Sequence, residues 1–250
     1  MKIKLILPFI LFCANICLAI NPQRNYAETP KTYEFPFKEL KLKTVDDVQI
    51  NTWNITPQGK AKKNITIIMC GGDSGNMSYL LRPSLVLASK GYNVISFDYR
   101  GFGKSQDFKI DTNLLFYNEY LFDFEAVVKY AKKLYPKNKI GTLGYSLGGY
   151  FPLITKEKLD FMIADSPLIA PTTFLERLQL QYVQLPDKFI DPVVKPIPQL
   201  YFLGTKDRRI HIEDVPNNFA VLHKGDHVEA EYTMGDTFYT FIESLLKSLK

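Results

Sequence analysis

The sequence predicts an α/β fold, with a mostly parallel central sheet and helices on both of its faces. One observation is that short apolar runs, which suit strands, alternate along the chain with segments of helical spacing. A second is that runs such as residues 64–70 and 161–165 are largely apolar without alternation, as expected of strands buried on both faces. The chain has 250 residues, which is long enough for one such domain with a sizeable core.

The amino-terminal residues have the pattern of a secretory signal peptide. Lys2 and Lys4 form a short basic region, residues 5–18 are almost wholly apolar, and Ala19 closes the segment. The apolar run is short for a helix that crosses a bilayer. We therefore expect residues 1–19 to be cleaved and the mature protein to be secreted or periplasmic.

Composition excludes several classes of protein. Apolar residues make up 46% and charged residues 23% of the chain, which is ordinary for a globular protein. The formal charge of +5 is mild and scattered, so nucleic acid is not an expected partner.

The cysteines predict neither a lipid anchor nor a disulfide. Lipid attachment at Cys17 is disfavoured because the bulky Ile16 precedes it. Cleavage would leave Cys70 as the remaining cysteine, so we expect no internal disulfide.

The strands follow from local patterns. Residues 20–34 are polar and contain prolines, which suits an extended arm before a single domain over residues 35–250. Alternation in residues 35–43 and 48–56 around a turn predicts an antiparallel hairpin. The strands expected after it are residues 64–70, 92–98, 139–143, 161–165, 199–203 and 219–222.

The helices follow from spacing and from their stop signals. The helices expected are residues 77–90, 113–135, 150–156 and 236–249. The first stops at Gly91 and the second at Pro136. Residues 166–198 are the least regular part, and a helical patch at 172–182 between prolines predicts a small cap there.

The strongest chemical signal is a G-x-S-x-G sequence centred on Ser146, between a strand and a helix. A serine hydroxyl is a weak nucleophile, and a sharp turn at a strand end exposes it beside a base. Such a turn leaves no room for Cβ atoms two residues to either side, which accounts for Gly144 and Gly148. The helix start also directs N–H groups to where an oxyanion would form.

Other reactive residue types also follow strands. They are residues 71–76, Asp98, Asp165, Asp207 and His227. The carboxyl ends of parallel strands meet at one edge of a sheet. We therefore expect these groups to gather around the serine.

Five motifs occur in a set order: CGGDSGN, GYNVISFDYRGFGKSQ, GYSLGG, GTKD and KGDH. With these motifs, and over roughly residues 35–250, the chain resembles the α/β-hydrolase superfamily. It is most similar to the compact esterase, lysophospholipase and serine-aminopeptidase-like branch. The resemblance implies an α/β-hydrolase fold with a small cap, a serine hydrolase activity, and no metal or organic cofactor.

The resemblance also assigns the site residue by residue. It implies that Ser146 is the nucleophile, Asp207 the acid and His227 the base. The backbone N–H of Leu147 would be one oxyanion donor, and an N–H near Asp73 the second. The chain order of serine, acid and histidine matches the family.

Two features depart from the family pattern. The family often has His-Gly where this chain has Gly71-Gly72, and that histidine usually organises the oxyanion loop. The segment 208–218 has room for a turn or two, where relatives usually have a full helix. Asp98 and Arg100, in the glycine-rich turn after the fourth strand, are interpreted as structural.

Four other residues have side chains that could serve in a triad. Asp165 ends a strand and is the alternative acid, or else a cap for the segment that follows. Asp226 adjoins the expected base but is poorly placed to orient its ring. His223 is expected to be structural, and His211 to be solvated in a polar loop.

The expected activity is cleavage of carboxylic esters with acyl or lipid-like groups. Apolar side chains predicted to form the pocket are Tyr145, Met77, Tyr79, Phe174, Leu178 and Tyr182. Amide or peptide cleavage by the same groups is an alternative, because the triad alone does not separate the two. A binding protein of the same fold without catalysis is a further alternative, suggested by Gly71 and by the short segment after Asp207.

Overall fold

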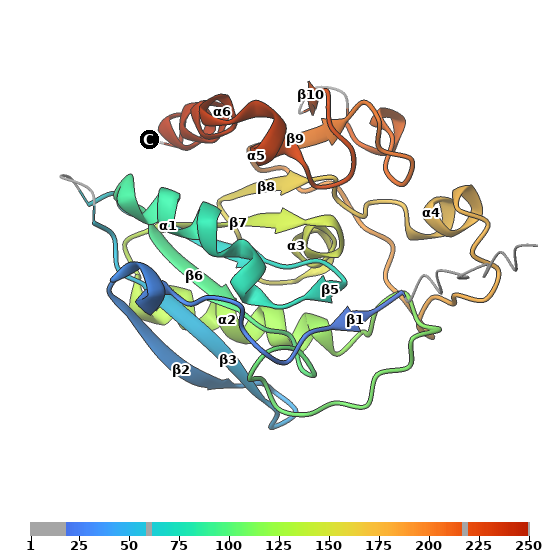
Figure 1. Cartoon of the computed structure of the whole chain (residues 1–250), viewed down its shortest axis with the longest axis horizontal. Coiled ribbons are helices and arrows are strands. Elements are labelled where there is room, and N and C mark those ends of the chain that lie inside the picture. Colours follow the sequence, from blue (N-terminus) through green and yellow to red (C-terminus); the bar gives the residue numbers. More distant parts are fainter. Residues whose placement is uncertain (1–18, 59–61, 217–219, 250) are drawn as a thin grey trace, which may run out of the picture.

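A computed structural model describes residues 19–58, 62–216 and 220–249 of the chain (Figure 1). All but the last residue of the expected signal peptide lies outside the described residues. The central sheet has eight strands in the order β10-β9-β8-β7-β4-β6-β3-β2. The strands are β2 (Phe37–Lys43), β3 (Gln49–Ile55), β4 (Ile65–Cys70), β6 (Asn93–Phe97), β7 (Lys139–Tyr145), β8 (Phe161–Asp165), β9 (Gln199–Gly204) and β10 (Ala220–His223). The β2–β3 hairpin is antiparallel and the sheet is mostly parallel, as predicted; the β3–β6 pair is also antiparallel, which was not predicted.

Helices cover both faces of this sheet (Figure 1). They are α1 (Leu81–Ser89), α2 (Tyr120–Leu134), α3 (Phe151–Ile154), α4 (Pro171–Arg177), α5 (Ala230–Met234) and α6 (Asp236–Lys247). Short 3₁₀ turns span Pro30–Tyr33, Met77–Leu80, Ser146–Gly149 and Ile212–Asp214. Strand β4 shows how the core divides: Ile67 and Met69 pack with α1 and α6, whereas Ile68 and Cys70 pack with α2 and α3. A strand alternates its side chains between faces, so one continuous apolar run supplies both halves of the core.

The predicted helix over residues 113–135 is wrong in its first third, because α2 begins only at Tyr120. Leu115 and Phe116 are buried, but they enter the core from an irregular segment. The backbone there bonds across to the cap region instead, with Leu115 N donating to Gln184 O at 2.9 Å and Gln184 N donating to Asn113 O at 2.7 Å. A tertiary partner thus replaces the helical bonds that the spacing predicts.

The cap region is less helical than predicted. Helix α4 ends at Arg177, and Gln179 then has a φ of 53°, a left-handed conformation that stops the helix. Figure 1 shows α4 apart from the helices that cover the sheet, and the rest of residues 166–198 as an irregular trace. Helix α3 is also short, since Thr155 is extended, and α5 was not predicted at all.

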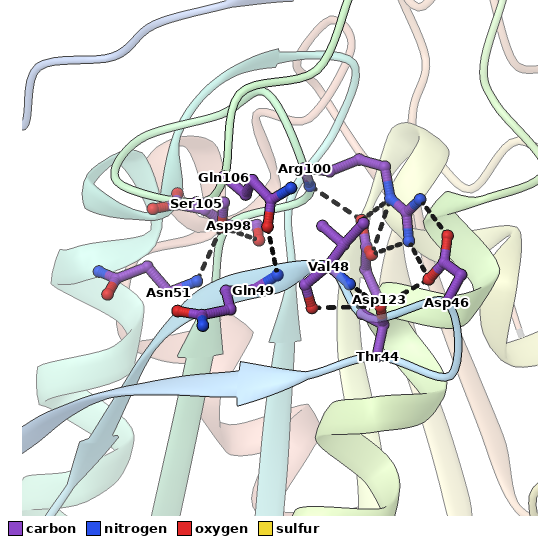
Figure 2. Close-up of polar contacts among 10 residues, drawn as sticks. All are labelled: Thr44, Asp46, Val48, Gln49, Asn51, Asp98, Arg100, Ser105, Gln106 and Asp123. Carbon is purple, nitrogen blue, oxygen red and sulfur yellow. Dashed lines mark hydrogen bonds and ion pairs between the residues drawn. The ribbon is translucent and has the colours of Figure 1, made fainter.

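A buried ionic network holds the turn that follows β6 (Figure 2). The Arg100 guanidinium binds Asp123 of α2 at 2.8 Å and Asp46 of the β2–β3 turn at 2.6 Å. Beside it, Ser105 Oγ donates to the Asp98 carbonyl at 2.7 Å and accepts from Asn51 N at 2.7 Å. These contacts agree with the structural role predicted for Asp98 and Arg100.

Outside the main sheet, two short strands pair in parallel: β1 (Asn21–Pro22) and β5 (Ser74–Gly75). The expected polar arm is therefore bound to the loop after β4. Ile20 is fully buried in the core. Across the residues described, no helix has both the length and the apolar character to cross a membrane.

Candidate active site

Ser146 lies at the carboxyl edge of the sheet, on the tight turn between β7 and α3. Its φ is 49°, which is a strained value for a residue with a Cβ. A Cβ on Gly144 would come within 2.4 Å of the Gly148 carbonyl oxygen, and a Cβ on Gly148 within 2.2 Å of the Cys70 carbonyl oxygen. The two glycines are thus sterically required, and the turn holds the serine side chain at the end of the strand.

His227 and Asp207 form a direct pair. The His227 Nδ1 lies 2.8 Å from Asp207 Oδ2. Neighbouring strands β9 and β10 deliver the two loops to the same edge, and Lys206 N donates to Gly225 O at 3.0 Å to join them. An imidazole with Nδ1 engaged in this way keeps Nε2 for another partner.

The Asp207 carboxylate is held in its ionised form. Its other oxygen accepts N–H groups of Arg209 at 2.8 Å and Ile210 at 3.2 Å. Burial alone would raise the pKa of Asp207, but the hydrogen bond and charge of His227 and the two N–H groups outweigh it. The pKa is lowered to about 2, so this carboxylate is anionic at neutral pH.

The predicted alternative acid has a different set of contacts. Asp165 is fully buried, and its Oδ2 accepts the N–H of Ala230 at 2.9 Å, at the start of α5. Burial raises the pKa of Asp165 to about 7. Its nearest histidine is His223, with Nε2 3.9 Å from Asp165 Oδ1. Asp165 therefore caps α5, and its Oδ1 also accepts the hydroxyl of Ser166, the first residue after the strand, at 3.4 Å. It has no hydrogen bond to His227.

The remaining candidates are placed away from the imidazole of His227. Asp226 Oδ1 accepts the backbone N–H of His227 at 2.7 Å and makes no contact with the ring. His223 is buried, with its Nδ1 accepting from Gly225 N at 3.1 Å and bound to Thr233 Oγ1 at 2.8 Å, as a structural role requires. His211 lies 3.2 Å from Glu213 in the short loop after Asp207.

Ser146 and His227 line two cavities that meet at these residues. The first has a volume of about 310 Å³ and is named the apolar lobe for the side chains of Leu115, Phe174, Leu178 and Leu180 on one side of it. Its other side is polar, with Asn21, Asp73, Ser74 and Arg209. Phe174 and Leu178 were predicted to line the pocket, whereas Leu115 and Leu180 were missed because the pairing of 113–115 with the cap is invisible in the sequence.

The second cavity, the polar lobe, has a volume of about 300 Å³. It contains the ion pair of Arg82 and Glu231, 2.6 Å apart, beside Tyr79, Tyr145 and Tyr232. Tyr79 and Tyr145 are expected from the sequence in one apolar pocket with Phe174, but they lie in this second cavity instead. The ion pair joins helices α1 and α5 and has no signal in the sequence. Two predicted lining residues lie elsewhere: Met77 is in the core, and Tyr182 lines neither lobe.

The glycine loop, residues 71–76, follows β4. It lies against the serine turn, since a Cβ on Gly72 would be 3.5 Å from Tyr145 O and 3.7 Å from the Ser146 Cβ. Asp73 follows and lines both lobes. Burial raises the pKa of Asp73, against the lowering effect of His227 and Arg209. The N–H of Leu147 belongs to the 3₁₀ turn that starts at Ser146.

Within the described residues, no group of three or more His, Cys, Asp or Glu side chains could hold a metal ion. A larger cavity of about 530 Å³, lined by Lys63, Lys137, Lys139 and Lys247, lies at the amino ends of the strands. It contains none of the residues above. The reactive groups are thus concentrated at the carboxyl edge.

The parallel sheet, its two helical layers and a serine turn at the carboxyl edge beside an Asp–His pair define an α/β hydrolase. A family model described as the alpha/beta hydrolase fold matches residues 64–200, which is more than half of the chain. The chain belongs to this family.

Individual relatives are distant. The uncharacterized protein YfhR of Escherichia coli strain K12 is 26% identical, over 89% of this chain and 87% of its own length. An uncharacterized membrane protein of Saccharomyces cerevisiae is 26% identical over 61% of this chain, and the match spans about half (51%) of the yeast protein. Among solved structures, the Pyrococcus furiosus esterase Pf2001 has a TM-score of 0.72 and 25% identity, covering 92% of this chain and 97% of that one.

Proposed function

We propose that this protein hydrolyses carboxylic esters through a Ser146–His227–Asp207 triad and an acyl-enzyme. The observation that carries the proposal is the 2.8 Å contact between His227 Nδ1 and Asp207, because His227 lines the same two cavities as Ser146. A buried anionic partner on Nδ1 orients the ring and stabilises it when it becomes charged.

The proposed reaction uses these groups in sequence. His227 Nε2 takes the proton of the Ser146 hydroxyl as the oxygen attacks the acyl carbon. The N–H groups of Leu147 and of the Gly72–Asp73 region stabilise the oxyanion. His227 then gives the proton to the departing alkoxide, and a water molecule activated by the same imidazole releases the acid product. Asp207 stays ionised throughout, which its lowered pKa favours.

The two lobes suit different parts of an ester substrate. The apolar lobe suits an acyl chain, because side chains such as Leu115 and Phe174 gain from excluding water there. The polar lobe, with Arg82 and Glu231, suits a leaving group that can form hydrogen bonds. The esterase Pf2001, whose fold is similar, is consistent with ester cleavage.

Amide hydrolysis is the second candidate. The ion pair of Arg82 and Glu231 favours it, because the two charges could bind an amino-acid leaving group. Matched p-nitrophenyl esters and p-nitroanilides of the same acyl group test the choice. Faster turnover of the esters supports the proposal, and faster turnover of the anilides contradicts it.

A binding role without catalysis predicts a different result. Such a protein would retain its ligand after Ser146→Ala and show no turnover that depends on Ser146. Ester hydrolysis by the purified wild type that disappears in Ser146→Ala would exclude this role.

We further propose that the mature protein acts outside the cytoplasm. The support is the signal-peptide pattern of residues 1–19. Amino-terminal sequencing of the protein recovered from its cells tests it. A mature chain that begins at Ile20 is expected, and a retained Met1 would contradict cleavage.

A further inference from the structure

The amino-terminal segment 20–26 is bound to the glycine loop by backbone hydrogen bonds. Asn21 N donates to Asp73 O at 2.9 Å, and Gln23 N donates to Gly75 O at 2.8 Å. The residues 74 and 75 form strand β5, and its partner in the described part of the chain is β1 of this segment (Figure 1). The strand that pairs with the glycine loop therefore comes from a segment that precedes the main sheet in the chain.

Asn76 adds a second connection at the end of the glycine loop. Its Nδ2 donates to Gln23 O at 3.0 Å and to Asn25 O at 2.8 Å. Its Oδ1 accepts from the backbone N of Ser78 at 3.0 Å and so caps the turn before α1. The nitrogen of this buried amide thus binds the amino-terminal segment, and its oxygen binds the turn before α1.

A third connection passes through the carboxylate of Asp98. One oxygen accepts the N–H of Met77 at 2.7 Å, directly after the glycine loop. The other accepts the hydroxyl of Tyr26, the last residue of the segment. At the opposite end of the segment, Ile20 is fully buried in the core. Both ends of the segment are therefore fixed, with the glycine loop bound between them.

The need for such support follows from the loop's composition. Gly71 and Gly72 are consecutive, and glycine has more backbone freedom than any other residue. Neither of these two residues has a side chain that could hold the first part of the loop in place. An N–H donor contributes to catalysis only when it is already aimed at the developing oxyanion.

We propose that residues 20–26 position the oxyanion donor of the glycine loop, with Asn76 as the positioning residue that joins the two. The inference rests on the proposed function, because it concerns the oxyanion of that reaction. A correctly placed donor acts mainly on the transition state. Loosening the segment should therefore lower kcat and leave KM nearly unchanged.

The test uses a matched pair of substitutions in the full chain. Gln23→Pro removes the N–H that binds Gly75 O, whereas Gln23→Ala keeps it and changes only an exposed side chain. We expect Gln23→Pro to lower kcat for a p-nitrophenyl ester by about 10-fold or more, given what the loss of one oxyanion donor costs, with KM within about two-fold. Gln23→Ala should match the wild type.

Asn76→Asp provides a second variant in case the proline disturbs folding. It keeps the oxygen that Ser78 uses, but turns the amide donor into an oxygen facing two carbonyl groups. We expect the same fall in kcat, together with faster hydrogen exchange at the Asn21 amide. A kcat within two-fold of wild type despite faster exchange, or an equal fall in Gln23→Ala, would overturn the inference.

Failure of the proposed function has its own signature. The wild type would then hydrolyse neither ester nor anilide, and Ser146 would not react with a fluorophosphonate. Failure of the positioning inference looks different. The wild type would then hydrolyse the ester, and Gln23→Pro and Asn76→Asp would be equally active.

Discussion

His227 and Asp207 are 20 residues apart in the chain, yet Nδ1 of one lies 2.8 Å from Oδ2 of the other. Parallel neighbours β9 and β10 produce this contact, because each loop leaves its strand at the same edge of the sheet. The pair fixes the orientation of the imidazole. It also distinguishes Asp207 from Asp165, which binds the amino end of α5 instead.

Replacing Asp207 with Asn should remove most of the activity. The amide would place a donor or a neutral oxygen against Nδ1, and the charged imidazole would lose its anionic partner. We expect kcat/KM for a p-nitrophenyl ester to fall by about 10³- to 10⁴-fold. Steady-state kinetics of the purified variant give the answer.

Asp165→Asn is the matched control for that substitution. Its amide oxygen still accepts the N–H of Ala230, and it has no contact with His227. We expect kcat/KM within about 10-fold of wild type, because Asp165 affects the imidazole only through the loop it supports. A larger loss in Asp165→Asn than in Asp207→Asn would reverse the assignment of the acid.

The Asp207 pair also predicts how stability depends on pH. Its pKa is about 2 in the folded protein, below the ordinary 3.8. A carboxyl with a lowered folded pKa contributes stability above its unfolded pKa and loses it as the pH falls through the folded value. Asp207 should thus add about 2 kcal/mol to the free energy of unfolding near pH 5, and lose it toward pH 2.

Urea unfolding of wild type and Asp207→Asn at several pH values measures this contribution. The difference between the two proteins should narrow as the pH falls below about 4. A difference that is constant with pH would mean that the ionised carboxylate is not what stabilises the loop.

The serine turn predicts a sharp contrast between two glycines. A Cβ on Gly148 would lie 2.2 Å from the Cys70 carbonyl oxygen, whereas a Cβ on Gly71 would have Leu80 Cδ1 at 3.9 Å as its nearest neighbour. Gly148→Ala should destabilise the protein by about 3 kcal/mol and abolish ester hydrolysis, and Gly71→Ala should change stability by less than about 0.5 kcal/mol. Thermal unfolding and a single ester assay measure both effects, and equal stabilities would contradict the geometry of the turn.

The serine turn and the strand ends before Asp207 and His227 could be predicted from the sequence, because each depends on a short stretch of neighbouring residues. The spacing of Gly144, Ser146 and Gly148 predicts a tight turn of the backbone. The apolar runs before Ser146, Asp207 and His227 predict strands that end at these residues. The order of the strands in the sheet then brings the three together. Much of the fold follows from the same patterns.

Contacts between distant segments could not be predicted in this way. Residues 113–119 have helical spacing, but the backbone of Asn113 and Leu115 bonds to Gln184 of the cap region instead. The ion pair of Arg82 and Glu231, and the pairing of Asn21 with the glycine loop, likewise join parts of the chain whose own patterns do not indicate a partner. Each depends on tertiary packing, which local propensity does not record.

The buried network around Arg100 should be important for stability. Its side chain is 2% exposed and pairs with Asp123, which is fully buried. Arg100→Leu would leave that carboxylate without its cation, and we expect a loss of about 3 to 5 kcal/mol. Urea unfolding measures it, with the exposed Lys38→Leu as the control. A loss below 1 kcal/mol would show that the network is dispensable.

The apolar lobe predicts a change in acyl-chain preference. Leu180 is half-buried and lines this lobe away from the polar one. Leu180→Trp should reduce the volume open to the acyl chain, so that kcat/KM for an octanoate ester falls about 10-fold or more relative to acetate. Tyr232→Trp, in the polar lobe, serves as the control. Equal losses for both esters in Leu180→Trp would place the acyl chain elsewhere.

The most direct measurement is the reaction of purified protein with a fluorophosphonate, followed by identification of the modified peptide. We predict a single modification on Ser146 that is absent from Ser146→Ala and strongly slowed in His227→Ala. A folded wild-type protein that does not react, or a modification that persists in Ser146→Ala, would contradict the assignment of Ser146 as the nucleophile.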